Sequence, residues 1–121
     1  MKRDMDFIRE ILLRVEADPR FNGSHFVVFD TSDFEGHSQE EIAYHIDLLF
    51  EAGLVDGVAT LDAPAAAISK VTWKGHEFID DTRDPDIWAK TKERTKGLVS
   101  VGMAIVSEVA KAEIKKKLGL S

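Results

Sequence analysis

The segment from Ser38 to Val55 constrains the fold of this chain more than any other part of the sequence. Ser38 can accept the free N–H groups of a helix's first turn, and Glu41 completes a capping box three residues later. Gly53 supplies the left-handed residue that ends many helices. Between these signals the apolar residues recur at helical spacing, at Ile42, Ile46, Leu49 and Phe50. The pattern predicts one amphipathic helix that leads directly into a strand.

Two β-prone runs, residues 54–61 and 68–73, follow this helix, and the tip D-A-P-A-A-A (residues 62–67) separates them. Such a pair predicts a β-hairpin with a six-residue tip. In a winged-helix domain, the third helix is followed in the same way by a β-hairpin, which is called the wing.

Earlier and later signals complete that domain. Asp4 caps a first helix, which Asp18-Pro19 ends because proline lacks an N–H group and disfavours a helical residue before it. Residues 25–29 predict a short strand, and residues 30–37 predict a polar turn where a second helix would normally stand. Thr72 or a neighbour caps a short helix after the hairpin.

Asp84-Pro85-Asp86 is the clearest internal boundary. Beyond it, residues 87–96 and 98–118 predict two helical segments. The expected fold is therefore α+β: a winged-helix-like domain with a small β-hairpin wing over residues 1–84 and a C-terminal helical extension over residues 85–121.

Charge divides the chain unevenly. Residues 1–86 carry 8 Lys and Arg against 19 Asp and Glu, a balance of −11, whereas residues 87–121 carry 8 against 3, a balance of +5. An acidic body disfavours general binding of polyanions by that body. The basic tail is left to pair with the body, with a partner or with phosphates.

Composition excludes several classes of site. The 121 residues contain no cysteine, which rules out disulfides, thiolate metal sites and a cysteine nucleophile. The chain also lacks a Walker loop, a dinucleotide-binding glycine fingerprint and a G-x-S-x-G elbow. Its N-terminus does not resemble a signal peptide, and its longest apolar run is far shorter than the ~20 residues of a membrane span. We expect a cytoplasmic protein that is not an enzyme, with no cofactor, metal or membrane.

The helix that begins after Ser38 offers an acidic outward face. DNA reading favours Arg, Lys, Asn or Gln, because phosphates repel carboxylates. A protein-interaction surface is therefore expected at Tyr44, His45, Asp47 and Glu51. The alternative is DNA binding through Gln39, Tyr44, Lys70, Lys111, Lys115 and Lys116.

The C-terminal segment carries a wide apolar face that must be buried somewhere. Docking on the body, self-association and binding of a partner protein all remain open. The candidate association residues are Val99, Met103, Val106 and Ile114.

Three stretches together resemble a bacterial and phage family of uncharacterised small proteins, a domain of unknown function. They are M-K-R-D-M-D-F-I-R-E-I-L-L, E-E-I-A-Y-H-I-D-L-L-F-E-A-G-L-V and V-T-W-K-G-H-E-F-I-D, with D-I-W soon after. The resemblance implies a winged-helix-like fold in bacterial or prophage genomes, and it brings no catalytic residue. We expect a non-enzymatic interaction module, a phage-related or bacterial regulatory adaptor acting through protein contacts. The alternative is a dimeric winged-helix DNA-binding transcriptional regulator.

Overall fold

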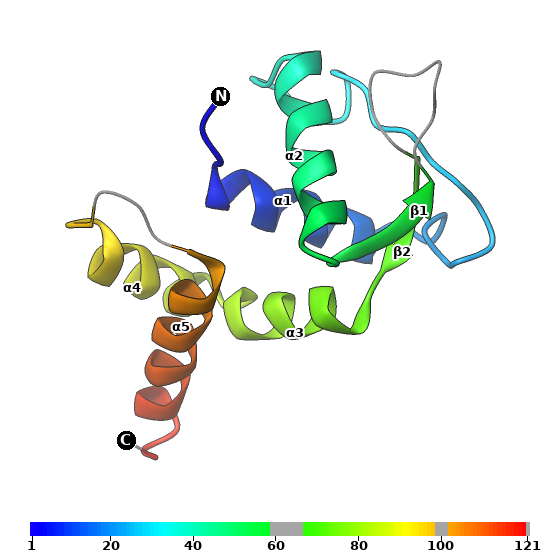
Figure 1. Cartoon of the computed structure of the whole chain (residues 1–121). Coiled ribbons are helices and arrows are strands. Elements are labelled where there is room, and N and C mark those ends of the chain that lie inside the picture. The colour runs from blue at the N-terminus through cyan, green and yellow to red at the C-terminus, as the bar shows by residue number, and fades with distance from the viewer. Residues whose placement is uncertain (59–66, 99–101, 121) are drawn as a thin grey trace. The chain divides into compact units, whose positions relative to one another are not determined.

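A computed structural model describes residues 1–58, 67–98 and 102–120. Within these ranges the chain is α+β, with five helices and a two-stranded antiparallel hairpin (Figure 1). In chain order the elements are α1 (Met5–Ala17), α2 (Gln39–Glu51), β1 (Val55–Val58), β2 (Ala67–Val71), α3 (Trp73–Thr82), α4 (Pro85–Thr95) and α5 (Met103–Lys117). No helix in the described ranges is long and apolar enough to span a bilayer.

The chain divides into two compact units, Met1–His76 and Glu77–Ser121. The division falls within α3, so the boundary predicted at Asp84-Pro85 lies inside the second unit. The structure does have a turn at Asp84-Pro85, and this turn separates α3 from α4. The boundary between the two compact units lies at a different place, within α3.

Helices α1 and α2 begin where the capping residues predict. The Asp4 carboxylate accepts the backbone N–H of Phe7 at 3.2 Å, and Ser38 and Glu41 form the full capping box. Gly53 follows α2 with φ of +73°. Both helices bury apolar faces in the core of the first unit, which includes Ile8, Ile11, Leu12, Val15, Ile42, Ile46 and Leu49.

Residues 18–37 connect these two helices without a further helix. The predicted turn over residues 30–37 is confirmed, and it buries Phe34 against Phe29 with ring centroids 4.9 Å apart. The strand predicted over residues 25–29 is wrong, because only Val27 pairs, in an antiparallel bridge with Ile68 of β2. The bridge nevertheless gives the order Val27, β2, β1 across the small sheet.

The hairpin contains a bulge between Asp56 and Gly57. A Cβ atom on Gly57 would lie 2.0 Å from the Ala67 carbonyl oxygen, so glycine is required where the strands approach this closely. Residues 59–66, which include most of the predicted hairpin tip, lie outside the described residues.

Thr72 caps α3, as the sequence predicts. Its hydroxyl accepts the Gly75 N–H at 3.1 Å and donates to the Gly53 carbonyl at 2.6 Å. The start of α3 is thereby tied to the end of α2 within the first unit.

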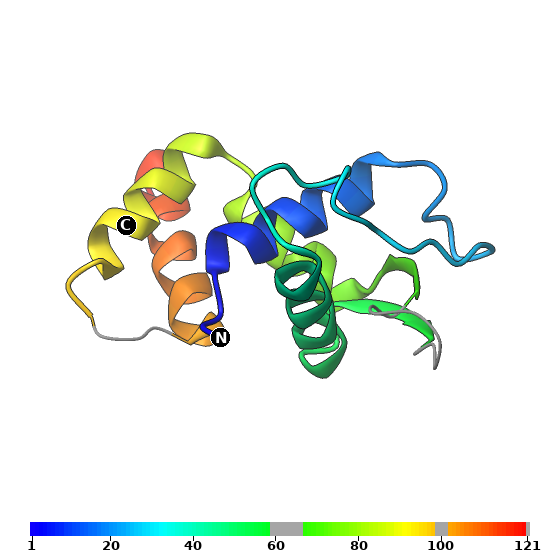
Figure 2. The ribbon, with the colours of Figure 1, turned by 90° about the horizontal axis from the view of Figure 1, so that it is seen from above.

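In the second unit, α4 and α5 lie side by side (Figures 1 and 2). Asp84 caps α4, and Pro85 occupies its first turn, where a missing N–H group has no cost. Buried residues of the pair are Ile87, Trp88, Thr91, Val106, Ala110 and Glu113. Helix α5 begins at Met103, five residues later than predicted, after the weak junction at Gly102.

Candidate functional site

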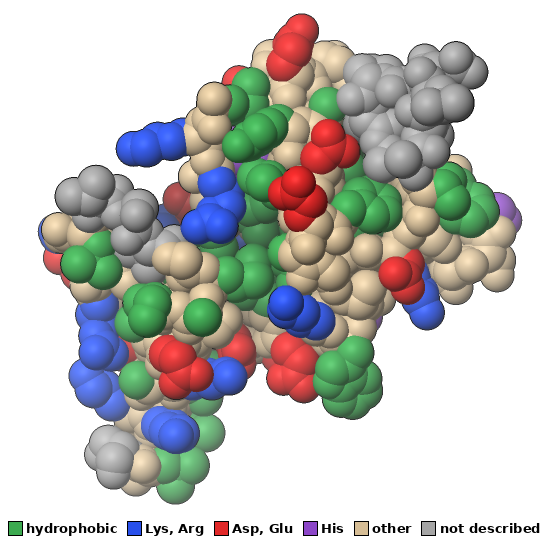
Figure 3. Space-filling model, viewed as in Figure 1, with side chains coloured by type: hydrophobic (Ala, Val, Ile, Leu, Met, Phe, Trp, Pro, Cys, Tyr) green, Lys and Arg blue, Asp and Glu red, His purple; other side chains and the backbone are tan. Residues whose placement is uncertain are grey.

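An exposed line of four residues runs along α2: Glu40, Tyr44, Asp47 and Glu51, which we call the acidic ridge. Their spacing of four, three and four residues places them on one helix face over roughly 16 Å, at about 1.5 Å per residue. The helix contains no lysine or arginine. Figure 3 shows acidic side chains gathered along α2. The predicted residues Tyr44, Asp47 and Glu51 therefore do share one surface.

Glu41, the fourth carboxylate of α2, already has partners within the first unit. Glu41 contacts the His37 Nδ1 atom at 3.0 Å and accepts the Ser38 N–H at 3.4 Å. The His37 contact and the Ser38 hydrogen bonds together hold the pKa of the Glu41 carboxyl below its ordinary value. His37 itself stacks on Phe7 with ring centroids 3.7 Å apart. This cluster fixes the N-terminal end of α2 against α1, so the ridge stands on a supported helix.

The prediction that His45 faces a partner is wrong. Its side chain is only 2% exposed. The Nδ1 atom lies 2.8 Å from the Glu41 carbonyl oxygen, and Nε2 accepts the Asp4 backbone N–H at 2.9 Å. His45 follows the exposed Tyr44 in sequence, so the helical turn rotates it into the core, where it links α2 to the start of α1.

The residues predicted to contact DNA are distributed over both units. In the first, Gln39 is half-buried at the start of α2, and Lys70 is exposed on β2 opposite Asp56. Lys111, Lys115 and Lys116 are exposed on α5 in the second unit. Lys116 lies 3.7 Å from Glu113 and Lys111 lies 3.9 Å from Glu108, so nearby carboxylates offset part of this positive charge.

The candidate association residues of the C-terminal segment differ in exposure. Val106 is buried beside Ala110 in the packing of α5 on α4, so its prediction as a surface contact is wrong. Met103 and Ile114 are half-buried, and Val99 lies outside the described residues. Ile105, which was not among the predicted association residues, is 51% exposed. The buried face of α5 consists of residues 106, 110 and 113. Because residue 113 is a glutamate, apolar spacing alone does not identify this face.

Ion pairs join α4 and its N-cap to α5: Arg94–Glu113, Lys117–Asp84 and, at 3.9 Å, Lys117–Asp86. Sequence reasoning missed these pairs. Glu113 is buried and accepts from Arg94 at 3.1 Å. Lys117 donates to Asp84 at 2.7 Å. This bond is the main cause of a lowered pKa for Asp84 and a raised pKa for Lys117. Part of the basic tail therefore stabilises the helix pair.

Beside this pair lies a pocket of about 330 Å³, with apolar walls from Ile87, Ile114 and Leu118 and an acidic rim that includes Asp81. Burial raises the pKa of Asp81, while the nearby Lys111 acts in the opposite direction. In the described part of the chain, no group of three or more His, Asp or Glu side chains is placed to hold a metal ion.

Comparison with known proteins gives two matches. The family described as "Hypothetical protein (DUF2513)" matches residues 2–101. An uncharacterized protein of Haemophilus influenzae is 32% identical over 122 residues, which cover 98% of this chain and 99% of that protein. No solved structure matches the chain. Because the family match spans most of the sequence and the relative aligns over nearly its whole length, this chain belongs to the DUF2513 family.

Proposed function

We propose that this chain is a non-enzymatic interaction module, a regulatory adaptor whose acidic ridge binds a cationic surface of a partner protein. The observation that carries the proposal is the arrangement of Glu40, Asp47 and Glu51 around Tyr44, all exposed on a helix without a cation. Tyrosine supplies contact area at low entropic cost, and the carboxylates attract a basic surface before contact.

The net charge of the first unit also favours a cationic partner. Residues 1–76 contain 7 Lys and Arg against 14 Asp and Glu, a balance of −7. A charge of this sign accelerates association with cationic partners and slows association with polyanions. The preferred partner is therefore a protein surface rich in lysine or arginine.

We assign a winged-helix-like architecture to the first unit as part of this proposal. Val27 forms a single bridge with β2, and β2 pairs with β1, so the segment preceding α2 lies beside the second strand of the hairpin. That order is typical of winged helices, and α2 then occupies the position of the third helix. The turn over residues 30–37 replaces the second helix.

The same strand order supports a second candidate, a dimeric DNA-binding regulator. In that reading α2 would enter the major groove, and Lys70 on the hairpin would contact a phosphate. The ridge argues against it, because three exposed carboxylates would face the phosphate backbone without a compensating cation on α2.

The C-terminal helix adds a proposed association surface. Ile105 is exposed on α5, and Leu118 and Leu120 are exposed just beyond its end. A contiguous exposed apolar surface marks a protein contact site, and we propose that Ile105 contributes to one. We assign self-association of the chain to the Ile105 face.

A photo-crosslinking residue placed at Tyr44 tests the ridge in cells. We expect a crosslinked protein partner whose yield falls when Glu40→Gln, Asp47→Asn and Glu51→Gln are combined with it. The matched control places the same crosslinker at Lys90, an exposed position on α4. An unchanged yield in the neutralised variant, or equal crosslinking from position 90, would contradict the proposal.

A gel shift with duplex DNA at two salt concentrations tests the alternative. Phosphate contacts make DNA affinity fall steeply as salt rises. We expect no complex at either concentration. Tight, salt-sensitive binding that weakens in Lys70→Ala would favour the DNA-binding regulator instead.

A further inference from the structure

The segment before Asp30 forms an incomplete sheet edge. Val27 donates to the Ile68 carbonyl and accepts the Ile68 N–H, both at 2.9 Å. Backbone groups alternate in direction along an antiparallel pair, so the N–H and C=O groups of Phe26 and Val28 point away from β2. Within the described ranges, these backbone groups form no hydrogen bond. The backbone N–H and C=O groups of Phe26 and Val28 therefore form a short row of donors and acceptors with the spacing of a β-strand.

The side chains along this edge are apolar and exposed. Phe26 is 59% exposed and Val28 is 42% exposed. Sheet edges are usually protected by lysine, proline or a bulge, and residues 25–29 contain none of these. Unpaired backbone beside exposed apolar side chains is a surface suited to another strand.

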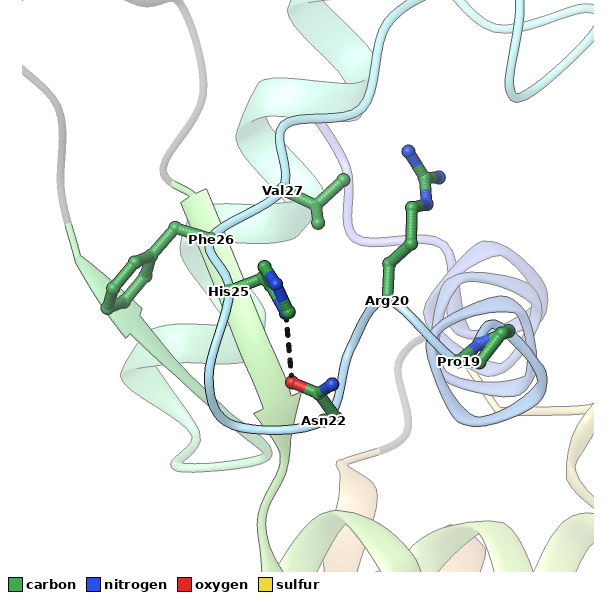
Figure 4. Close-up of a pocket in the computed structure, with 6 residues that line it drawn as sticks. All are labelled: Pro19, Arg20, Asn22, His25, Phe26 and Val27. Carbon is green, nitrogen blue, oxygen red and sulfur yellow. Dashed lines mark hydrogen bonds between the residues drawn. The ribbon is translucent and has the colours of Figure 1, made fainter.

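A pocket of about 430 Å³ runs beside the same segment, within the size range of ligand sites. It is lined by Pro19, Arg20, Asn22, His25, Phe26 and Val27. Figure 4 shows the Phe26 ring pointing away from the other five side chains that line the pocket. The pocket thus borders the unpaired edge at Phe26, and we call it the groove.

The walls of this groove are held in place before any partner arrives. Arg20 donates to the Asp18 carboxylate, with the shortest distance at 2.8 Å. Asn22 accepts the Ser24 N–H at 2.8 Å and contacts His25 at 3.2 Å (Figure 4). A preformed groove loses little conformational entropy on binding.

We propose that the Phe26–Val28 edge accepts an extended segment of a cationic partner protein as an added β-strand. The backbone groups select an extended polypeptide, since that is the ligand whose own N–H and C=O groups match them. Pro19 and Arg20 form the opposite wall, which leaves the groove suited to a single strand and not to the folded edge of a second copy. Asp18 offsets the charge of Arg20 on the wall, so the balance of −7 on the first unit favours a segment that carries lysine or arginine. The edge is a different surface from the acidic ridge.

The probe is a set of peptides obtained by phage display. Random heptapeptides are selected on the immobilised full chain, and the selected sequences are then synthesised as free peptides. We expect the selected peptides to carry Lys or Arg beside alternating apolar residues and to bind with Kd below about 1 mM. Nuclear magnetic resonance of the labelled chain should show shifted signals and slowed amide exchange at Phe26 and Val28. Selection of no such binder, or shifts confined to α2, would overturn the proposal.

Two variants at one position sharpen the test. Val28→Pro removes the outward N–H group, whereas Val28→Thr keeps it and preserves the branched shape. We expect peptide affinity to fall about tenfold or more in the first variant and to change little in the second. Equal affinity in both variants would overturn the proposal. If Val28→Pro does not fold, the amide exchange of the unmodified chain decides the question. Crosslinking from Tyr44 in Val28→Pro shows whether the ridge acts independently of the edge.

Discussion

Gly75 stands in the first turn of α3 and touches the backbone that leaves α2. A Cβ atom there would lie 2.2 Å from the Leu54 carbonyl oxygen and 2.6 Å from the Val71 Cγ1 atom. Gly75→Ala should therefore lower the free energy of unfolding by about 1–3 kcal/mol, although alanine is the better helix former. Urea unfolding followed by circular dichroism measures the change. Lys74→Ala, an exposed change in the same turn, is the control and should have little effect.

His45 has both ring nitrogens engaged inside the first unit, so its contribution is to stability. His45→Phe keeps a ring of similar shape but leaves the Asp4 N–H without its acceptor. The expected loss is about 1–3 kcal/mol in the free energy of unfolding. Tyr44→Phe, one residue earlier on the exposed ridge, should leave stability within about 0.5 kcal/mol. A reversed ranking of the two variants would show that the ring contacts are not formed.

At the scale of the elements, the cap of α2 should make stability depend on pH. The folded-state pKa of Glu41 lies below its ordinary 4.5, through the contacts of its side chain with His37 and Ser38. This contribution is present above the unfolded pKa and is lost as the pH falls through the folded value. Glu41→Gln should therefore be less stable than the parent at pH 7, and the difference should shrink below about pH 4.

Thermal unfolding of the parent and of Glu41→Gln across this pH range measures the effect. Glu40→Gln is the control. Both variants lose one carboxylate from the first turn, so both weaken the favourable interaction with the helix dipole equally. Only Glu41 also contacts His37 and Ser38. The same pH dependence in both variants would contradict the assignment to these contacts.

Elements whose signals are local could be predicted from the sequence. Asp4, Ser38, Glu41 and Gly53 act within a few residues of themselves, and α1 and α2 have the predicted starts and ends. The strand over residues 25–29 could not be predicted reliably, because pairing depends on β2, which lies far away in sequence. β-branched and aromatic residues mark a segment that can pair, and they do not specify how many of its residues will pair.

The candidate site shows the same division. Helical spacing alone placed Tyr44, Asp47 and Glu51 on one surface. It failed for His45, because a histidine is compatible with either face of an amphipathic helix. It failed again on α5, where the buried Glu113 is accommodated by Arg94, a partner 19 residues away. Polar residues inside a core become recognisable only when their partners are known.

At the scale of the whole molecule, we propose different tasks for the two units. The first unit presents the acidic ridge and the sheet edge, which are proposed to bind other proteins. In the second, the pairs Arg94–Glu113 and Asp84–Lys117 hold α4 and α5 together, while Ile105 stays exposed. Because Val106, Ala110 and Glu113 are the buried residues of α5, its exposed residues can be changed without removing the contacts with α4.

Ile105→Lys tests self-association on that basis. The change places a charge on the exposed face and leaves Val106 and Ala110 in their packing on α4. Sedimentation should show the unmodified chain above its monomer mass of 13.5 kDa at about 100 µM, with the variant at that mass. Ala104→Lys adds the same charge at an exposed position one residue earlier and should still associate. If the unmodified chain sediments as a monomer, or if both variants dissociate equally, α5 is a structural helix and the binding function belongs to the first unit.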